Sequence, residues 1–147
     1  MLAEYSFSKA RSSLTELVDR VQRLTLAVIR PRKKTEEPSV VLSRSLLLAI
    51  LRDAQGEHEV KPAFVEEPDG SITLMLEPLD IAVNGESRDA AIAAAVQEAI
   101  EYAQEYLNPE NVALYMHSPN RSHHLPIVIR IALCNSTSEI METLGLA

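Results

Sequence analysis

Apolar residues near the start of the chain recur at the spacing of one buried helix face. They follow the series i, i+4, i+7, i+8 and i+11, which places side chains on one side of an α-helix. The members of this stripe are Ala10, Leu14, Leu17, Val18 and Val21. Ser6 or Ser8 can serve as the N-cap, because a serine oxygen accepts a hydrogen bond from the first turn. The pattern predicts a helix with one buried side.

Two short runs rich in branched residues come next, Leu24–Arg30 and Ser39–Ser43. The segment between them, Pro31–Pro38, is charged and bounded by prolines. This order predicts a β-hairpin with a long basic tip. A leucine-rich helix through residues 46–51 should follow and end near Gly56.

In the second part of the chain, the pattern of residues predicts three strands followed by the longest helix. The strands span residues 58–66, 71–77 and 79–83, and the first two are joined by Pro68-Asp-Gly, which favours a tight turn. Ser87 can cap the helix. Its expected inner stripe consists of Ile92, Val96, Ala99, Ile100, Ala103 and Leu107.

The last part of the chain predicts a strand and a helix. Ile127–Leu133 is rich in β-branched residues, which favours a strand. The final helix has a capping box, Ser136-Thr-Ser-Glu139, and an end signal at Gly145. The fold class is therefore α+β: a small N-terminal helix and hairpin domain, residues 1–55, and an antiparallel sheet with helices, residues 56–147.

Charge divides the chain in the same way. The 147 residues carry a formal charge of −7, but Met1–Arg52 carries +5 and Asp53–Ala147 carries −12. Such asymmetry indicates two partners of opposite charge. The alternative is that ordinary solvated surface happens to be segregated.

Cysteine content and hydropathy predict where the protein resides. Cys134 stands alone, which excludes an internal disulfide and suits a reducing compartment. No apolar run is long enough to cross a bilayer. We expect a cytoplasmic protein with no membrane partner.

The residues that could support catalysis form no recognised pattern. Glycine is scarce, and neither of the glycine-rich phosphate loops occurs. His117, His123, His124 and Cys134 match no standard zinc-ligand spacing. We therefore expect no catalytic residues, no metal and no cofactor. A hydrolase that uses the histidines remains an alternative.

Basic residues of the first domain form a candidate nucleic-acid site. They lie at the start of the predicted helix, at the end of the first hairpin strand and at the hairpin tip. The set is Lys9, Arg11, Arg30, Arg32, Lys33 and Lys34. Lysine and arginine presented from regular elements suit phosphate contacts, although a basic tip can also serve solubility alone.

The opening stretch S-F-S-K-A-R-S-S-L-T-E-L-V-D-R-V, followed by A-V-I-R and S-V-V-L-S, resembles the N-terminal domain of Phd/YefM (prevent-host-death) antitoxins. The resemblance covers about the first 52 residues. It implies a homodimer that binds operator DNA, with Arg11 and Arg30 at the positions of the family's arginines. The hairpin tip is longer than the usual family turn, which leaves the placement of Arg32, Lys33 and Lys34 on DNA open.

The remainder of the chain differs from that family, whose members commonly end in a short disordered segment. Residues 64–107, with D-G-S-I-T-L, A-V-N-G-E-S and a long alanine-rich helix, are similar to HicB-type antitoxins. An acidic domain of this kind suits a basic toxin, because complementary charge accelerates association.

These observations predict a bacterial type II antitoxin. As a homodimer it would bind operator DNA, repress its own operon and neutralise a basic cognate toxin. Dimerisation is assigned to the apolar stripe at Leu14, Leu17, Val18 and Val21. The alternative is a non-enzymatic protein- or ligand-binding module without DNA affinity.

Overall fold

A computed structural model describes residues 3–23 and 25–147 and confirms an α+β fold. The chain divides into two compact units, the first ending at Ile50 and the second beginning at Leu51. The division falls inside helix α3, Arg44–Gln55. Each unit has its own apolar core.

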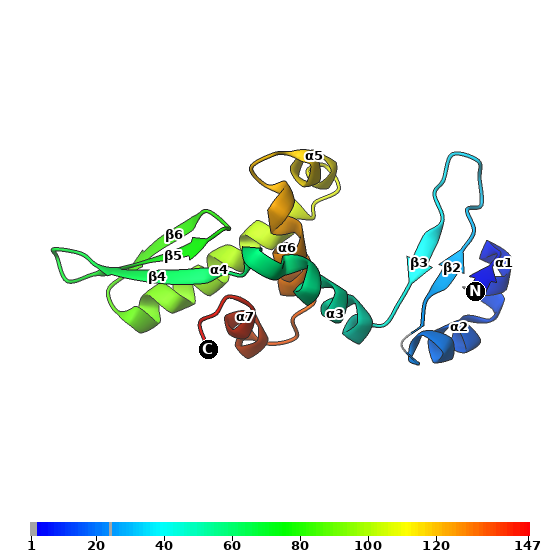
Figure 1. Cartoon of the computed structure of the whole chain (residues 1–147), viewed down its shortest axis with the longest axis horizontal. Helices are drawn as coiled ribbons and strands as arrows, with labels where there is room; N and C mark the ends of the chain where they lie inside the picture. Colours follow the sequence, from blue (N-terminus) through cyan, green and yellow to red (C-terminus); the bar gives the residue numbers. More distant parts are fainter. Residues whose placement is uncertain (1–2, 24) are drawn as a thin grey trace. The chain divides into compact units, whose positions relative to one another are not determined.

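Unit 1 combines a three-stranded sheet with two short helices (Figure 1). Its elements are β1 (Ala3–Tyr5), α1 (Phe7–Ser12), α2 (Leu14–Val21), β2 (Ala27–Ile29) and β3 (Ser39–Val41). Strands β2 and β3 are antiparallel, which confirms the predicted hairpin. Leu24, the predicted first residue of that hairpin, lies outside the described residues. Strand β1, which pairs in parallel with β2, was not predicted because three residues are too few to show a period.

The predicted first helix is two helices that meet at Ser13. The Ser13 N–H donates to the Lys9 carbonyl, and the Ser12 hydroxyl donates to the same oxygen. Ser13 itself leaves the helical region, with φ of −123° and ψ of 36°. The Ser12 side chain thus competes for a helical acceptor just before the break, which weakens the helix at this point.

Unit 2 is an antiparallel sheet with helices packed on it. Its strands are β4 (Lys61–Glu66), β5 (Ile72–Glu77) and β6 (Ile81–Gly85), paired in that order. Its helices are α4 (Arg88–Tyr106), α5 (Val112–His117), α6 (Leu125–Ala132) and α7 (Thr137–Thr143), with 3₁₀ turns η1 (Gly56–His58) and η2 (Ser122–His124). The turn between β4 and β5 forms as predicted: Gly70 has φ of +86°, and an Asp69 carboxylate oxygen accepts from the Ser71 N–H.

Helix α4 begins where Ser87 caps it, since the serine oxygen accepts from the Ala90 N–H at 3.2 Å. Its buried face differs from the predicted stripe and is richer in small residues. The buried members are Ala91, Ala95, Val96, Ala99, Ala103 and Tyr106. Ile92, Ile100 and Leu107 lie at the flanks and are half-buried. Alanines bring the helix close to the sheet, whereas larger residues reach neighbouring helices from the side.

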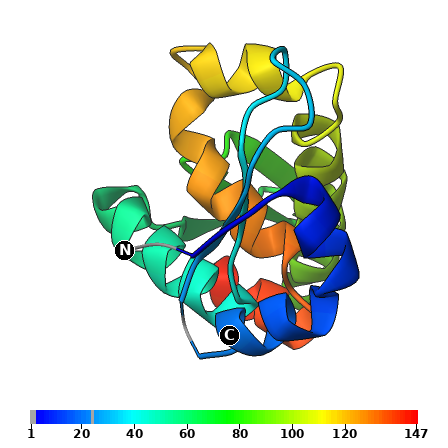
Figure 2. The same cartoon turned by 90° about the vertical axis from the view of Figure 1, so that its right-hand side faces the viewer.

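The segment Ile127–Leu133 was wrongly predicted as a strand, since most of it belongs to helix α6. Ile127, Val128 and Ile131 are buried, which is the i, i+1, i+4 pattern of a helix face. Pro126 in the first turn favours a helix start. Helix α6 packs along α4 (Figures 1 and 2), and this burial outweighs the modest preference of branched residues for strands.

The predicted N-terminal cap of the final helix is confirmed. The Ser136 hydroxyl oxygen accepts from the Glu139 N–H at 3.2 Å. The Glu139 carboxylate accepts from the Asn135 N–H, one residue before the expected partner. Gly145 follows the helix with φ of +71°, as an end signal should.

The contact between Gly85 and α4 gives a stability prediction. A Cβ atom at position 85 would lie 2.4 Å from the Ala91 backbone nitrogen. Gly85→Ala should therefore lower the free energy of unfolding by about 2 kcal/mol or more, measured by urea denaturation. Glu86→Ala, at an exposed neighbour, should change it by less than about 0.5 kcal/mol. Equal stability of the two variants would show that α4 can move away from the sheet.

Candidate nucleic-acid interface

Helix α1 presents two of the predicted basic residues on the surface of unit 1. The Ser6 side-chain oxygen accepts from the Lys9 N–H at 3.1 Å and fixes the start of the helix. Ala10 is buried in the core, so Lys9 and Arg11 on either side of it are exposed. The apolar pattern of the sequence thus places both charges in solvent.

Arg30 follows β2 at the same end of the sheet. Its backbone N–H donates to the Tyr5 carbonyl at 2.8 Å, which continues the pairing of β1 and β2. Tyr5 is the last residue of β1, and the Ser6 cap of α1 comes directly after it. The backbone therefore brings Arg30 next to the start of α1, and its side chain is exposed.

Arg32 is bound by its own hairpin. Its guanidinium donates to the Glu36 carboxylate, with Nη2 to Oε1 at 2.8 Å, and lies 4.9 Å from the centre of the Phe7 ring. The hydrogen bond from Arg32 lowers the pKa of the Glu36 carboxyl group. Arg32 consequently holds the base of the hairpin loop against α1, and it is less available to a phosphate than the other five residues.

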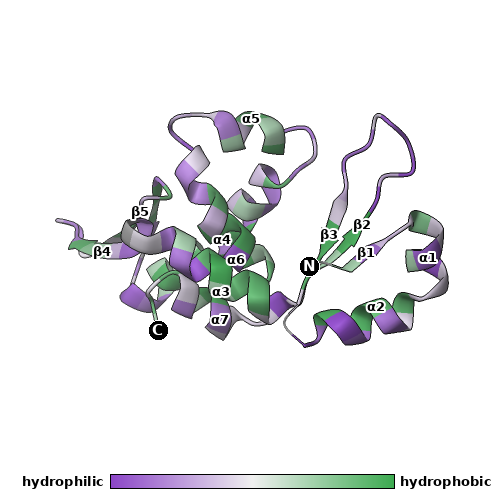
Figure 3. Ribbon diagram, turned by 45° about the vertical axis from the view of Figure 1, so that its right-hand side comes forward, coloured by the Kyte–Doolittle hydropathy of each residue, from purple (hydrophilic) through white to green (hydrophobic). Residues whose placement is uncertain are grey.

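Lys33 and Lys34 lie in the hairpin loop and are exposed. The Lys33 carbonyl accepts from the Glu36 N–H at 3.1 Å, which closes a turn at the tip. Figure 3 shows this loop in hydrophilic colours. The loop base and the start of α1 border a cavity of about 510 Å³ lined by Phe7, Arg30 and Arg32.

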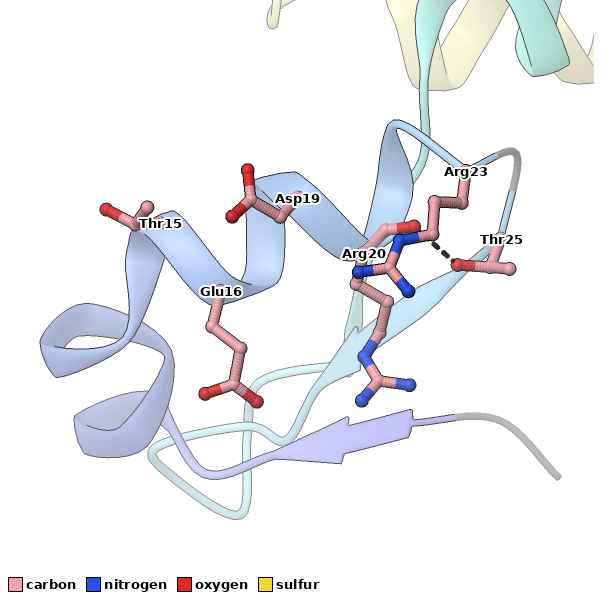
Figure 4. A pocket seen from close by; sticks show the side chains of 6 residues that line it. All are labelled: Thr15, Glu16, Asp19, Arg20, Arg23 and Thr25. Atoms are coloured by element: carbon pink, nitrogen blue, oxygen red, sulfur yellow. Dashed lines mark hydrogen bonds between the residues drawn. The ribbon is translucent and has the colours of Figure 1, made fainter.

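Two further arginines of unit 1 were not among the predicted site residues. Arg20 and Arg23 line a pocket on α2 together with Glu16, Asp19 and two threonines (Figure 4). Glu16 and Arg20 extend from the same side of the helix in this view. The Arg20 Nε donates to the Tyr5 hydroxyl at 3.2 Å, and its carbonyl accepts from Thr25. Because both acidic and basic side chains line this pocket, it is less suited to binding phosphate than the α1 surface.

The four predicted dimerisation residues separate into two groups. Leu17 and Val21 are buried in the core of unit 1. Leu14 and Val18 are 60% and 41% exposed and lie four residues apart on α2, so they share one side of the helix. Only the second pair is accessible to another protein.

His58, His123 and His124 lie in an aromatic cluster of unit 2, whereas His117 is exposed on α5. His124 is 1% exposed, and its Nδ1 lies 2.6 Å from the Tyr102 hydroxyl. His123 packs against His124 on one side and His58 on the other. Within residues 3–23 and 25–147, no group of histidine, cysteine and acidic side chains is arranged to hold a metal ion.

Other members of this cluster attach the α5 segment to α4. The Tyr106 hydroxyl donates to the Arg121 carbonyl at 2.9 Å, and the Tyr115 hydroxyl donates to the Glu105 carboxylate at 2.6 Å. The Arg121 guanidinium lies 4.3 Å from the centre of the Tyr115 ring. The two tyrosine hydrogen bonds are structural, since each satisfies a polar group at the edge of the core.

The chain matches a protein-family model over residues 1–146. The family is PHD-like and is described as the antitoxin of a toxin–antitoxin, RelE/RelB, TA system. The fold is similar to the crystal structure of an antitoxin part of a proposed toxin/antitoxin system from Syntrophomonas wolfei subsp. wolfei, with a TM-score of 0.72 and 22% identity. That alignment covers 97% of this chain and 96% of the other. No curated protein matches significantly.

The resemblance to antitoxins is confirmed by the family match, whereas the finer assignments to Phd/YefM and HicB types stay predictions. The family match points to a regulatory rather than a catalytic protein. No helix in the described part of the chain is both long and apolar enough to span a membrane.

The environment of His124 predicts a dependence of stability on pH. Burial lowers the pKa of His124, as do nearby His123 and Arg121, while Asp80 and a hydrogen bond with the Pro78 backbone oppose this. The unfolded chain, with a histidine pKa of about 6.5, then binds a proton more readily than the folded chain. Stability should fall as the pH drops below that value.

Urea unfolding midpoints at about pH 7.5 and about pH 5.5 would measure this dependence. His124→Gln should reduce the difference between the two midpoints, because it removes the titrating group. His117→Gln, at an exposed position, should leave the difference as in the wild type. An unchanged difference in His124→Gln would assign the pH dependence to other groups.

Proposed function

The chain belongs to the PHD-like family of toxin–antitoxin antitoxins, and from this premise we propose that it binds operator DNA as a homodimer and represses its own operon. It also neutralises a basic cognate toxin, and both activities take place in the bacterial cytoplasm. Residues 1–55 bind DNA and dimerise, as in Phd/YefM antitoxins. Residues 56–147, the HicB-like part, bind the toxin.

The observation that carries the DNA-binding proposal is the grouping of exposed basic residues on unit 1. Lys9 and Arg11 are exposed on α1, Arg30 follows β2 next to the start of that helix, and Lys33 and Lys34 are exposed in the hairpin loop. Phosphate contacts of this kind fix the position of a protein on DNA. Arg32 contributes by holding the loop base, since Glu36 and Phe7 occupy its guanidinium.

The acidic charge of the second part supports the assignment of the toxin to unit 2. A charge of −12 over Asp53–Ala147 opposes binding to nucleic acid and favours a basic protein. Separate surfaces of opposite charge allow one chain to hold DNA and toxin without either partner competing for the same site. Complementary charge mainly accelerates association and selects the partner.

Titration of the protein into its own promoter DNA tests the first activity, with a scrambled duplex as the reference. Binding to the promoter should be tighter, and the log–log salt slope should be about −5 to −7 if each chain of a dimer contacts three or four phosphates. Fluorescence anisotropy at several salt concentrations measures both the dissociation constants and the salt slope. Equal or absent binding to the two duplexes would favour the module without DNA affinity.

The double variant Arg11→Ala, Arg30→Ala should reduce the magnitude of this slope by about 3 to 4, because two contacts are lost in each chain of the dimer. Lys61→Ala removes one exposed positive charge from unit 2 and should leave the slope nearly unchanged. If both proteins retain the wild-type slope, these arginines do not contact DNA.

The exposed pair on α2 predicts a variant that separates the dimer. Leu14→Glu with Val18→Glu should yield monomers, because the change buries carboxylates in the dimer but exposes them harmlessly in a single chain. Light scattering coupled to size exclusion measures the mass. Leu114→Glu, at a leucine of α5 that is 68% exposed, should preserve the dimer. A monomeric wild type at micromolar concentration would contradict the proposal.

A further inference from the structure

The loop between β2 and β3 carries charges of both signs in one short segment. Residues 31–38 read Pro-Arg-Lys-Lys-Thr-Glu-Glu-Pro. Figure 1 shows the loop extending beyond the two strands that it connects. Its three basic residues favour contact with a phosphate backbone, whereas its two acidic residues oppose it. The two glutamates are therefore unexpected in a segment that contacts DNA.

The two glutamates of this loop differ in their partners. The Glu36 carboxylate accepts three hydrogen bonds from Arg32: from the backbone N–H at 3.1 Å, from Nε at 3.3 Å and from Nη2 at 2.8 Å. Glu36 is half-buried as a result. Glu37 is exposed and takes no part in these bonds. A charge at position 36 thus has a structural partner within the loop, which the neighbouring charge lacks there.

The bonds between Arg32 and Glu36 close a tight turn that contains two lysines. The Glu36 N–H also donates to the Lys33 carbonyl at 3.1 Å, so backbone and side chain close the same turn. Prolines at both ends of the loop fix φ and limit its alternatives. Lys33 and Lys34 lie between the bonded residues, and both are exposed. The loop therefore presents two positive charges from a turn whose ends are held.

The Phe7 ring attaches this turn to helix α1. Phe7 is the first residue of α1, and its side chain is 43% exposed. The Arg32 guanidinium lies 4.9 Å from the centre of the ring, within the range of a cation–π contact. An exposed ion pair adds little to stability by itself. Here the guanidinium that Glu36 binds also joins the loop to a helix, so the pair fixes the position of the loop.

We propose that Glu36, although acidic, is a positioning residue for DNA binding. By holding Arg32 on the Phe7 ring, it keeps the loop in one conformation. Lys33 and Lys34 then meet phosphates without first having to be ordered, which preserves binding energy. The proposal rests on the proposed DNA-binding function and specifies how the hairpin loop takes part in it.

Neutral replacements of the two glutamates separate this role from simple charge repulsion. The full-length chain would be titrated into its own promoter duplex, with fluorescence anisotropy as the readout. Glu36→Ala should weaken binding about three- to tenfold, because the loop must then be ordered on binding. Glu37→Ala removes the same charge from the next position and should strengthen binding by up to about threefold, because it only reduces repulsion.

The salt dependence of binding shows whether the loss arises at the two lysines. In the wild type, Lys33→Ala with Lys34→Ala should reduce the magnitude of the log–log salt slope by about 2 to 4, for one or two contacts in each chain of a dimer. In the Glu36→Ala background, the same two replacements should change the slope by less than about 1. A loss of general stability would not make the effect of the lysines depend on Glu36.

Arg32→Lys tests the same contacts from the other partner without any change of charge. Lysine cannot donate from a planar fork to the Glu36 carboxylate. This variant should therefore weaken promoter binding about three- to tenfold as well. Urea denaturation verifies that each variant is folded. If Glu36→Ala did not fold, Arg32→Lys would carry the comparison with Glu37→Ala.

The outcomes distinguish the role of Glu36 from DNA binding itself. If Glu36→Ala binds the promoter as tightly as the wild type or more tightly, the positioning role is overturned and the DNA-binding function stands. An unchanged salt slope after replacement of Lys33 and Lys34 in the wild type would also overturn it, because the loop would then make no phosphate contact. If the wild type does not prefer the promoter to a scrambled duplex, the DNA-binding function and the positioning role are overturned together.

Discussion

The structure of unit 2 depends on the close packing of α4 against strands β5 and β6. Gly85 leaves room for the Ala91 backbone, and a face of small residues that includes Ala95 and Ala99 continues the contact along the helix. Each alanine buries little apolar area, so the contact needs the full length of α4 to be stable. Helix α4 then provides flanks on which α6 and α7 pack, and the α5 segment is attached to it through the Tyr115–Glu105 hydrogen bond. The larger residues Ile100 and Leu107 lie at the flanks of α4 and are half-buried.

Unit 1 faces a different constraint, since its core is small. Strands of three residues and two short helices bury only a few large side chains, among them Tyr5, Leu17 and Val21. A domain of about 50 residues has a high ratio of surface to volume and gains much from burying additional apolar area. The exposed pair Leu14 and Val18 offers such area, which agrees with the proposed dimer. The exposed pair on this small unit therefore suits the symmetric interface of the proposed dimer.

The two units carry opposite charge, and in the proposed function each binds a different partner. Positive residues of unit 1 are presented from α1 and the hairpin, where backbone pairing between Tyr5 and Arg30 brings them together. Negative residues of unit 2 are distributed over its strands, turns and helices. A chain with both signs mixed on each surface would bind either partner more weakly, because like charges would face each partner. Because positive charges are concentrated in unit 1 and negative charges in unit 2, this repulsion is avoided.

The sequence by itself determined the α+β class, the hairpin, the turn at Asp69 and Gly70 and the caps at Ser87 and Ser136, because these depend on residues near one another in the chain. It also determined the exposure of Lys9, which falls outside the apolar stripe that contains Ala10. The tertiary structure decided that Ile127–Leu133 is mainly helical, since packing along α4 buries Ile127, Val128 and Ile131 together.

Only the fold showed that Arg32 is held by Glu36 and Phe7, and that Leu17 and Val21 face inward while Leu14 and Val18 do not. A repeating pattern identifies the apolar side of a helix, but it does not say which residues the same chain covers. That depends on contacts between segments distant in sequence, and one sequence read alone does not contain their geometry.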